Sequence, residues 1–378
     1  MRLVDLELTS WRNLATCVVK PGPSINVFHG DNAHGKTNLI EGIFYVATLR
    51  TFRPGRRSQL TQWGSPGFRL KARAEVEDRV VTFEVGLADG GRNLLVDGFG
   101  VDSTDEYFGG FNVVLFTPEH LALVRGEPAG RRSFVDRALF NVDAAQLRVV
   151  RRYNRVLRER NALLKRSGGV LADAVLIEAL DQQLARAGAE LVVRRLELLE
   201  DLSPGLARVH DKLTGGGKTL RMDYRARGLS EVLSKDRPAM DEADWTALLG
   251  EALVQRRGED LRRGFTGVGP HADDVALVLD ERPARLVASQ GEARTIVLAL
   301  KLAEVEWIHE RRTEPPVLLL DDMGSELDSV RRQVLFDYIG RMNCQTFVTT
   351  VDPHWVMTGE NNKYFQIVDG SVRHSEGW

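Results

Sequence analysis

Gly30, Gly35, Lys36 and Thr37 stand at the spacing G-x-x-x-x-G-K-[ST], which is typical of loops that bind nucleotide phosphates. Glycines let the backbone wrap tightly, so that successive N–H groups point at an anion. Lys36 would then reach the β- and γ-phosphates of ATP, and the Thr37 hydroxyl would coordinate Mg²⁺. The alternative is a glycine-rich turn that matches by chance. The pattern predicts an ATP-binding loop made of Gly30, Asp31, Asn32, Ala33, His34, Gly35, Lys36, Thr37 and Asn38.

Two adjacent carboxylates follow an apolar run in "PPVLLLDDMGSELD", residues 315–328. The run 317–320 has the continuous apolar character of a fully buried parallel strand. Asp321, at its end, is expected to hold Mg²⁺ through water together with Thr37. Asp322 is the candidate to polarise the attacking water, so Asp322 and Lys36 are the predicted catalytic pair. The alternative is an acidic turn after a strand.

A third element, "SQGEART" at 289–295, lies between these two motifs and just before a helix expected over 296–303. Its first four residues resemble the signature loop of ABC-type ATPases, in which a serine hydroxyl and backbone amides grasp the γ-phosphate of ATP bound to the opposite protomer. The assigned signature residues are Ser289, Gln290, Gly291 and Glu292. The loop Ser325, Glu326, Leu327 and Asp328 stands where such ATPases carry their D-loop. This resemblance implies an ATP-dependent homodimer, because one chain cannot complete its own site.

The elements around these motifs have the required order. An apolar strand at 24–28 precedes the glycine loop, and apolar residues at helical spacing follow it over 39–47. Three strands are expected over 1–29, and further strands at 68–76, 80–87, 93–96 and 111–116. Long helices are expected over 131–166, 173–213 and 242–263, and strands at 220–224, 273–279 and 344–350. Thr349 or Thr350 stands where a switch histidine would be sought.

The expected fold is therefore α/β: an ABC-type P-loop ATPase head of mixed sheets and helices with an inserted helical arm. The head is assigned to residues 1–118 and 264–378. The arm is assigned to 119–263 and is mainly helical, with a short hairpin. Apolar residues at alternating three- and four-residue spacing, Val150, Tyr153, Leu157 and Leu164, predict a packed seam that Arg160 interrupts.

The composition is that of an ordinary soluble protein, with 43% hydrophobic and 28% charged residues in 378 and a net charge of −2. Any surface that binds nucleic acid must therefore be local. Two cysteines, Cys17 and Cys344, form no disulfide framework and fit a reducing compartment. No apolar run approaches about 18 residues, so no membrane span is expected and the predicted location is the cytoplasm.

Two groups of arginines are candidates for contacts with DNA phosphates. One lies on the link after the first motif, at Arg53, Arg56 and Arg57, and the other on the first arm helix, at Arg148, Arg151, Arg152, Arg155 and Arg158. The alternative for the second group is a solvated face that pairs with acids of the facing helix, namely Glu190, Glu197 and Glu200. No motif reads bases, so any DNA binding should be independent of sequence.

Over its whole length the sequence resembles the RecF family of bacterial recombination and repair ATPases, which are related to the heads of SMC proteins. The matching segments are "GDNAHGKTN" (30–38), "FTPEHL" (116–121), "GRRSFVD" (130–136), "GPHADD" (269–274), "ASQGEARTIVLALKLAE" (288–304) and "LLLDDMGSELD" (318–328). The chain departs from the family's usual residue at His120, Ala272, Glu292 and Ala293.

The resemblance implies a weak, DNA-stimulated ATPase without nuclease activity that dimerises on ATP and uses Mg²⁺. It also implies binding to double-stranded DNA near single/double-strand junctions, and help in loading RecA onto gapped DNA together with RecO and RecR. Two other functions are weighed: an ABC-type ATPase motor of another assembly, such as a transporter, and a small-molecule kinase that uses only the P-loop. The long helical insertion between Lys36 and Asp321 is unlike a transporter motor, and the kinase would leave the signature loop idle.

Overall fold

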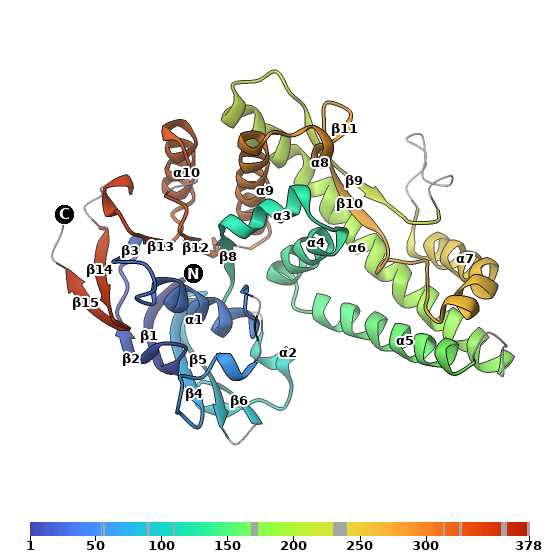
Figure 1. Ribbon diagram of the computed structural model, residues 1–378, viewed down its shortest axis with the longest axis horizontal. Coiled ribbons are helices and arrows are strands. Elements are labelled where there is room, and N and C mark those ends of the chain that lie inside the picture. Colours follow the sequence, from blue (N-terminus) through green and yellow to red (C-terminus); the bar gives the residue numbers. More distant parts are fainter. Residues whose placement is uncertain are drawn as a thin grey trace. The chain divides into compact units, whose positions relative to one another are not determined.

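The structure, a computed structural model, describes residues 1–53, 55, 57–88, 91–108, 110–167, 173–229, 240–312, 314–324, 327–356 and 361–375. Two compact units make up the chain (Figure 1). Unit 1 comprises Met1–Leu121, Lys212–Gly216 and Val297–Trp378, and unit 2 comprises Ala122–Asp211 and Gly217–Ile296. Residues 264–296 thus group with unit 2, although the division made from the sequence places them in the head. The functional domain boundaries stay a prediction.

One sheet of unit 1 is mainly parallel, with the strand order β15-β14-β3-β13-β12-β8. Only β15 runs antiparallel to its neighbour. All residues of β3, β12 and β13 are buried, as expected for central strands of a parallel sheet, and the apolar run 317–320 lies in β12. The strands are β3 (Ile25–His29), β8 (Val113–Phe116), β12 (Val317–Asp321), β13 (Thr346–Thr350), β14 (Lys363–Val368) and β15 (Ser371–Ser375). Because β3, β13 and β12 are parallel neighbours, their carboxyl ends meet at one edge, where ligands of such sheets bind.

The second sheet of unit 1 is antiparallel, with the order β2-β1-β4-β5-β6-β7. In β1 the residues Leu3, Leu6 and Leu8 are buried, and a register shift between Leu3 and Asp5 keeps all three on the core side. The strands are β1 (Arg2–Trp11), β2 (Leu14–Val19), β4 (Phe68–Val76), β5 (Arg79–Ala88), β6 (Gly91–Val96) and β7 (Phe99–Gly100). The strands expected near the N-terminus and over 68–96 are confirmed.

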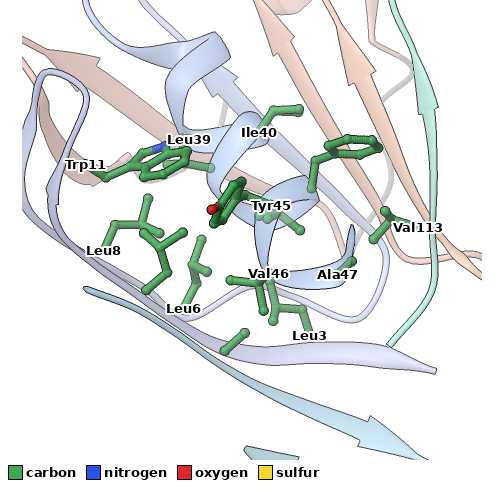
Figure 2. Packing of buried hydrophobic residues seen from close by; sticks show 14 of the residues in the cluster. Leu3, Leu6, Leu8, Trp11, Leu39, Ile40, Tyr45, Val46, Ala47 and Val113 are labelled. Carbon is green, nitrogen blue, oxygen red and sulfur yellow. The ribbon is translucent and has the colours of Figure 1, made fainter. Parts of the chain in front are cut away.

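Helix α1 (Lys36–Thr48) packs against strands of both sheets and carries the core of unit 1. Figure 2 shows Leu39, Tyr45 and Val46 of α1 on the side of the helix that faces Leu3, Leu6, Leu8 and Trp11 of β1. Trp11 also donates from its indole nitrogen to the Asn38 carbonyl at 2.8 Å. The helix that follows the glycine loop is therefore fixed at its first turn by the antiparallel sheet.

Short helices complete unit 1, together with the two longer helices α9 and α10. Their bounds are η1 (Arg57–Gln59), α2 (Thr104–Tyr107), η2 (Pro118–Leu121), α9 (Gln290–Arg311), α10 (Ser329–Met342) and η3 (Pro353–Trp355). The first residues of α9, up to Ile296, belong to unit 2. Both cysteines are buried free thiols, as expected.

Unit 2 is mainly helical and carries a three-stranded sheet of order β11-β10-β9. Its elements are α3 (Ala122–Arg125), α4 (Pro128–Val142), α5 (Gln146–Arg166), α6 (Ala174–Thr214), β9 (Leu220–Arg225), α7 (Glu242–Arg263), β10 (Asp274–Leu279), β11 (Arg282–Pro283) and α8 (Ala284–Val287). The single helix expected over 131–166 is wrong, because the chain breaks into α4 and α5 at 143–145. There the Asp143 carboxylate accepts a hydrogen bond from the Ala145 N–H at 2.8 Å, as acidic residues do at helix boundaries.

Arg160 interrupts the seam of α5 for a physical reason. Its guanidinium is fully buried and donates to Asp181 of α6 at 2.6 Å and to Asp260 of α7 at 2.8 Å. A third bond goes to the Thr266 hydroxyl. Around it, Val149, Tyr153, Val156 and Leu163 form the buried stripe of α5. The charge therefore joins three helices in the core of unit 2, and burial without these partners would be costly.

Within the described part of the chain, none of the helices has the length and apolar content needed to cross a membrane.

Candidate nucleotide site

The glycine loop connects β3 to α1, as the sequence predicts. Gly30 and Gly35 have φ values of 145° and 113°, and Ala33 lies in the left-handed region at 66°. A Cβ at Gly30 would lie 2.4 Å from the Ile367 carbonyl oxygen of β14, and one at Gly35 would lie 2.9 Å from the Asn13 side chain. Both positions therefore require glycine. The two glycines thus let the loop wrap tightly against β14 and the β1–β2 turn, as a phosphate-binding loop requires.

Lys36 is buried at the start of α1, and its ammonium lies inside this loop. The Nζ atom donates to the carbonyl oxygens of Gly30 at 2.7 Å and Asp31 at 2.8 Å. Burial lowers the pKa of Lys36, and the nearby carboxylates of Asp322, Asp31 and Asp321 oppose that shift. The cation is thus held where phosphate oxygens would arrive, at the positive end of α1.

The Asp321 carboxylate meets two hydroxyl groups at the carboxyl edge of the parallel sheet. Its Oδ1 accepts from the Thr37 hydroxyl at 3.0 Å and from the Thr349 hydroxyl at 2.7 Å. Burial raises the pKa of Asp321, and hydrogen bonds from Thr349 and Thr37 act in the opposite direction. A carboxylate and a hydroxyl are hard oxygen donors that suit Mg²⁺. The two residues assigned to the metal from sequence are therefore neighbours.

Asp322 turns the chain away from β12. Its φ of 51° is left-handed, and its N–H donates to the Thr349 hydroxyl at 3.0 Å. Thr349 therefore links both acidic residues through β13, which separates β12 from β3. The sequence alone indicates only that Thr349 or Thr350 stands where a switch histidine would be sought.

Residues outside the motif fix the loop and the first turns of α1. Asn13 accepts from the Asn38 side chain at 2.6 Å and donates to the Ala33 carbonyl at 3.4 Å. The fully buried Glu41 accepts two bonds from Arg12 and one from Arg53. The sequence carries no signal for these contacts, because the β1–β2 turn that supplies Arg12 and Asn13 lies far from α1 along the chain.

The predicted signature loop stands at the N-terminus of α9 in unit 2. Ser289 and Gln290 are exposed, and Gly291 and Glu292 are half-buried. The Ser289 N–H donates to the Glu292 carboxylate at 2.8 Å, and the Glu292 N–H donates to the Ser289 hydroxyl at 3.2 Å. This reciprocal pair is a capping box, which holds the serine at the first turn of the helix.

Of the predicted D-loop, Ser325 and Glu326 lie outside the described residues. Leu327 is buried, and the Asp328 carboxylate caps α10 by accepting from the Arg331 N–H at 2.9 Å.

The two candidate DNA surfaces differ in their partners. On α5, the side chains of Arg148, Arg151, Arg152, Arg155 and Arg158 are all exposed. Arg152 pairs with Glu190 of α6, and Arg155 lies 4.0 Å from Glu159. The pairing alternative thus holds for Arg152. On the link, Arg53 bonds to Glu41 inside unit 1. Arg56 lies outside the described residues, and the Arg57 side chain is not described.

Comparison with known proteins agrees with this geometry. Residues 2–373 match the model of the RecF/RecN/SMC N-terminal domain family. The chain is 42% identical over 357 residues to a DNA replication and repair protein RecF of Myxococcus xanthus (strain DK1622), covering 93% of this chain and 91% of that protein. It is 37% identical over 374 residues to the RecF of Citrifermentans bemidjiense, covering 98% and 100% of the two chains.

Solved structures match as well. Two of them, described as the recombination mediator protein RecF-ATPrS and RecF-ATP in the RecFOR pathway, each have a TM-score of 0.89 at 29% identity. Both cover 99% of this chain, and 98% and 97% of the respective solved chains. An SMC head bound to a winged-helix domain of ScpA, with a TM-score of 0.57 at 15% identity, shares the fold, and 99% of this chain and 97% of that chain are covered. The mixed α/β, ABC-type head fold with a helical insertion is thereby confirmed, and the chain belongs to the RecF family of DNA replication and repair proteins.

Proposed function

We propose that this protein is an ATP-dependent, sequence-independent double-stranded DNA-binding protein of recombinational repair. In this proposal it dimerises on ATP and assists RecA loading at gapped DNA together with RecO and RecR. The observation that carries the proposal is that the Lys36 ammonium, the Thr37 hydroxyl and the Asp321 carboxylate lie at the same edge of the parallel sheet. Two solved RecF structures that cover 99% of this chain are described with ATP or ATPrS and with the RecFOR pathway. They support ATP as the ligand and RecO and RecR as the partners.

The proposed nucleotide chemistry assigns each motif one task. The residues 30–38 bind the phosphates, Thr37 and Asp321 would hold Mg²⁺, and the metal would neutralise charge on the phosphates. Asp322 orients and deprotonates the attacking water as general base. Residues 1–118 and 264–378 form the ATPase head, and residues 119–263 form the arm.

Dimerisation is proposed to follow from the shared site. Ser289 to Glu292 of one copy would contact the ATP that is bound by Lys36 and Thr37 of a second copy, with 325–328 as the D-loop beside it. The serine is exposed, and the capping box fixes it at the first turn of α9, where a nucleotide bound to a second copy could reach its hydroxyl. ATP then joins two copies, and its hydrolysis releases them.

We expect Ser289→Arg to bind ATP with wild-type affinity but to remain monomeric in light scattering with ATP and Mg²⁺. The reason is that a bulky side chain at the start of α9 blocks contact with the second nucleotide while the phosphate loop of unit 1 is untouched. Ser289→Ala serves as the milder control. An Arg variant that dimerises like the wild type would refute the shared site.

DNA binding is expected to be strongly dependent on salt and indifferent to sequence. Reversing the charge of Arg151, Arg155 and Arg158 should weaken binding and reduce the slope of log K against log salt by up to about 2.7, because fewer counterions are released. Gel retardation over a salt series, with several duplex sequences, measures this slope. A control triple at the exposed Arg79, Arg92 and Arg373 should change it far less. An unchanged slope in the α5 triple would place the DNA elsewhere.

A further inference from the structure

A lysine outside every motif touches the signature loop. Lys218 follows the glycine run 215–217 and stands two residues before the start of β9. Its ammonium donates to Glu292 Oε1 at 2.5 Å, and the exposed fractions of the two side chains are 47% and 30%. Both side chains therefore lie at the surface of unit 2, where a second copy can reach them.

The Glu292 carboxylate has two opposite effects on Ser289, three residues before it. Its carboxylate accepts the Ser289 N–H and so fixes the serine backbone. Hydrogen bonds lower the pKa of Glu292 to about 2, the one from Lys218 having the largest effect and those from Ser289 adding to it. This carboxylate is therefore negative at neutral pH. A γ-phosphate that approaches the Ser289 hydroxyl also approaches this charge. Like charges that meet across an interface oppose binding.

The backbone around Lys218 is fixed. The next residue, Thr219, donates from its N–H to the Asp280 carboxylate at 2.9 Å and accepts the Asp280 N–H at 3.0 Å. The buried His210 ring also hydrogen-bonds to the Lys218 backbone. The β9–β10 pair and α6 thus fix the Lys218 backbone, from which the side chain reaches Glu292, 74 residues away along the chain.

We infer that Lys218 is a positioning residue of the signature loop: it neutralises and holds the Glu292 carboxylate, so that the Ser289 hydroxyl can donate a hydrogen bond to the γ-phosphate of ATP bound to a second copy. This inference rests on the proposed function, and it adds a fifth residue to the trans half of the site. Lys218 acts through Glu292 and is not assigned any contact with the nucleotide.

The test is a double-mutant cycle on dimerisation with ATP and Mg²⁺, followed by light scattering. Lys218→Met should raise the dimer dissociation constant by roughly 10- to 100-fold, because an unpaired carboxylate then faces the phosphate. Glu292→Gln keeps the acceptor for the Ser289 N–H without the charge, so its own dissociation constant is the reference for the double variant. The double variant Lys218→Met/Glu292→Gln should return close to the affinity of Glu292→Gln, and Lys218→Arg should behave like the wild type.

The salt dependence of dimerisation distinguishes loss of the Lys218 charge from loss of structure. The defect of Lys218→Met should shrink between low and high ionic strength, because screening weakens the repulsion. The matched control is Lys71→Met, which removes a lysine 3.7 Å from Glu84 in unit 1 and should leave dimerisation unchanged.

Two results would overturn the inference. One is a Lys218→Met protein that dimerises like the wild type, and the other is a double variant that stays as defective as Lys218→Met. Failure of the proposed function looks different, because the wild type would then stay monomeric with ATP, or Ser289→Arg would dimerise. Either of these would remove the basis of the inference as well.

Discussion

Lys36→Met is expected to abolish detectable ATP binding, with a loss in affinity of at least about 100-fold, because charge-assisted hydrogen bonds to phosphate are lost in a desolvated loop. In the structure the Lys36 ammonium already lies inside the loop, on the carbonyls of Gly30 and Asp31. Methionine fills similar space without a donor. Titration with a fluorescent ATP analogue measures the effect.

Lys36→Arg is the control for charge. Its guanidinium is broader and planar, so it should retain part of the ATP affinity while turnover falls. Thermal unfolding of both variants without nucleotide should match the wild type. A Lys36→Met protein that binds ATP with unchanged affinity would show that the glycine loop is not the phosphate site.

Asp322→Asn is expected to leave Mg²⁺-ATP binding intact and to lower turnover by about 10²- to 10⁴-fold, the usual contribution of a general base. Asparagine tolerates the left-handed backbone found at this position, so the turn after β12 should persist. The dimer should then have a longer lifetime on DNA, because hydrolysis is the release step. Wild-type turnover itself should be slow, below the ~10 per second typical of enzymes.

Asp321→Asn is the matched comparison, one residue away. Asp321 accepts hydrogen bonds from Thr37 and Thr349, and loss of its charge should weaken the Mg²⁺-dependent part of ATP binding. ATP affinity with and without Mg²⁺, turnover and dimer lifetime should be measured for both variants. If Asp322→Asn hydrolyses ATP at the wild-type rate, or if the two variants behave alike, the division of roles is wrong.

Local patterns were sufficient to predict much of the fold. Strand β4 and helix α7 have the predicted bounds, because period-2 and period-3.6 patterns with clear end signals specify them. The strand, glycine loop and helix around Lys36 were also predictable, since the loop tolerates only glycine at two positions. The contact between Thr37 and Asp321 was predictable as well. The glycine loop follows β3 and Asp321 ends β12, and the carboxyl ends of parallel strands meet at one edge of a sheet.

Pairings between distant residues were not predictable in the same way. The break between α4 and α5 depends on the side chain of Asp143, in a sequence without glycine or proline at that point. Arg160, which interrupts an apolar seam, forms ion pairs with acidic residues of α6 and α7. Glu41 of α1 forms an ion pair with Arg12 in the β1–β2 turn. The pairing of Lys218 with Glu292 could not be predicted from local sequence, because the two residues are 74 positions apart and meet only in the folded chain.

In the proposed dimer each ATP is held by two copies, one contributing the phosphate loop and the other the signature loop. This arrangement is tested by mixing the Lys36→Met and Ser289→Arg proteins and measuring ATP turnover at a total concentration at which the wild type dimerises. Each variant alone should be inactive. In the mixed dimer, the intact loop of the Ser289→Arg chain meets the intact signature of the Lys36→Met chain, so turnover should reappear at part of the wild-type rate. A mixture no more active than the sum of its two components would contradict the shared site.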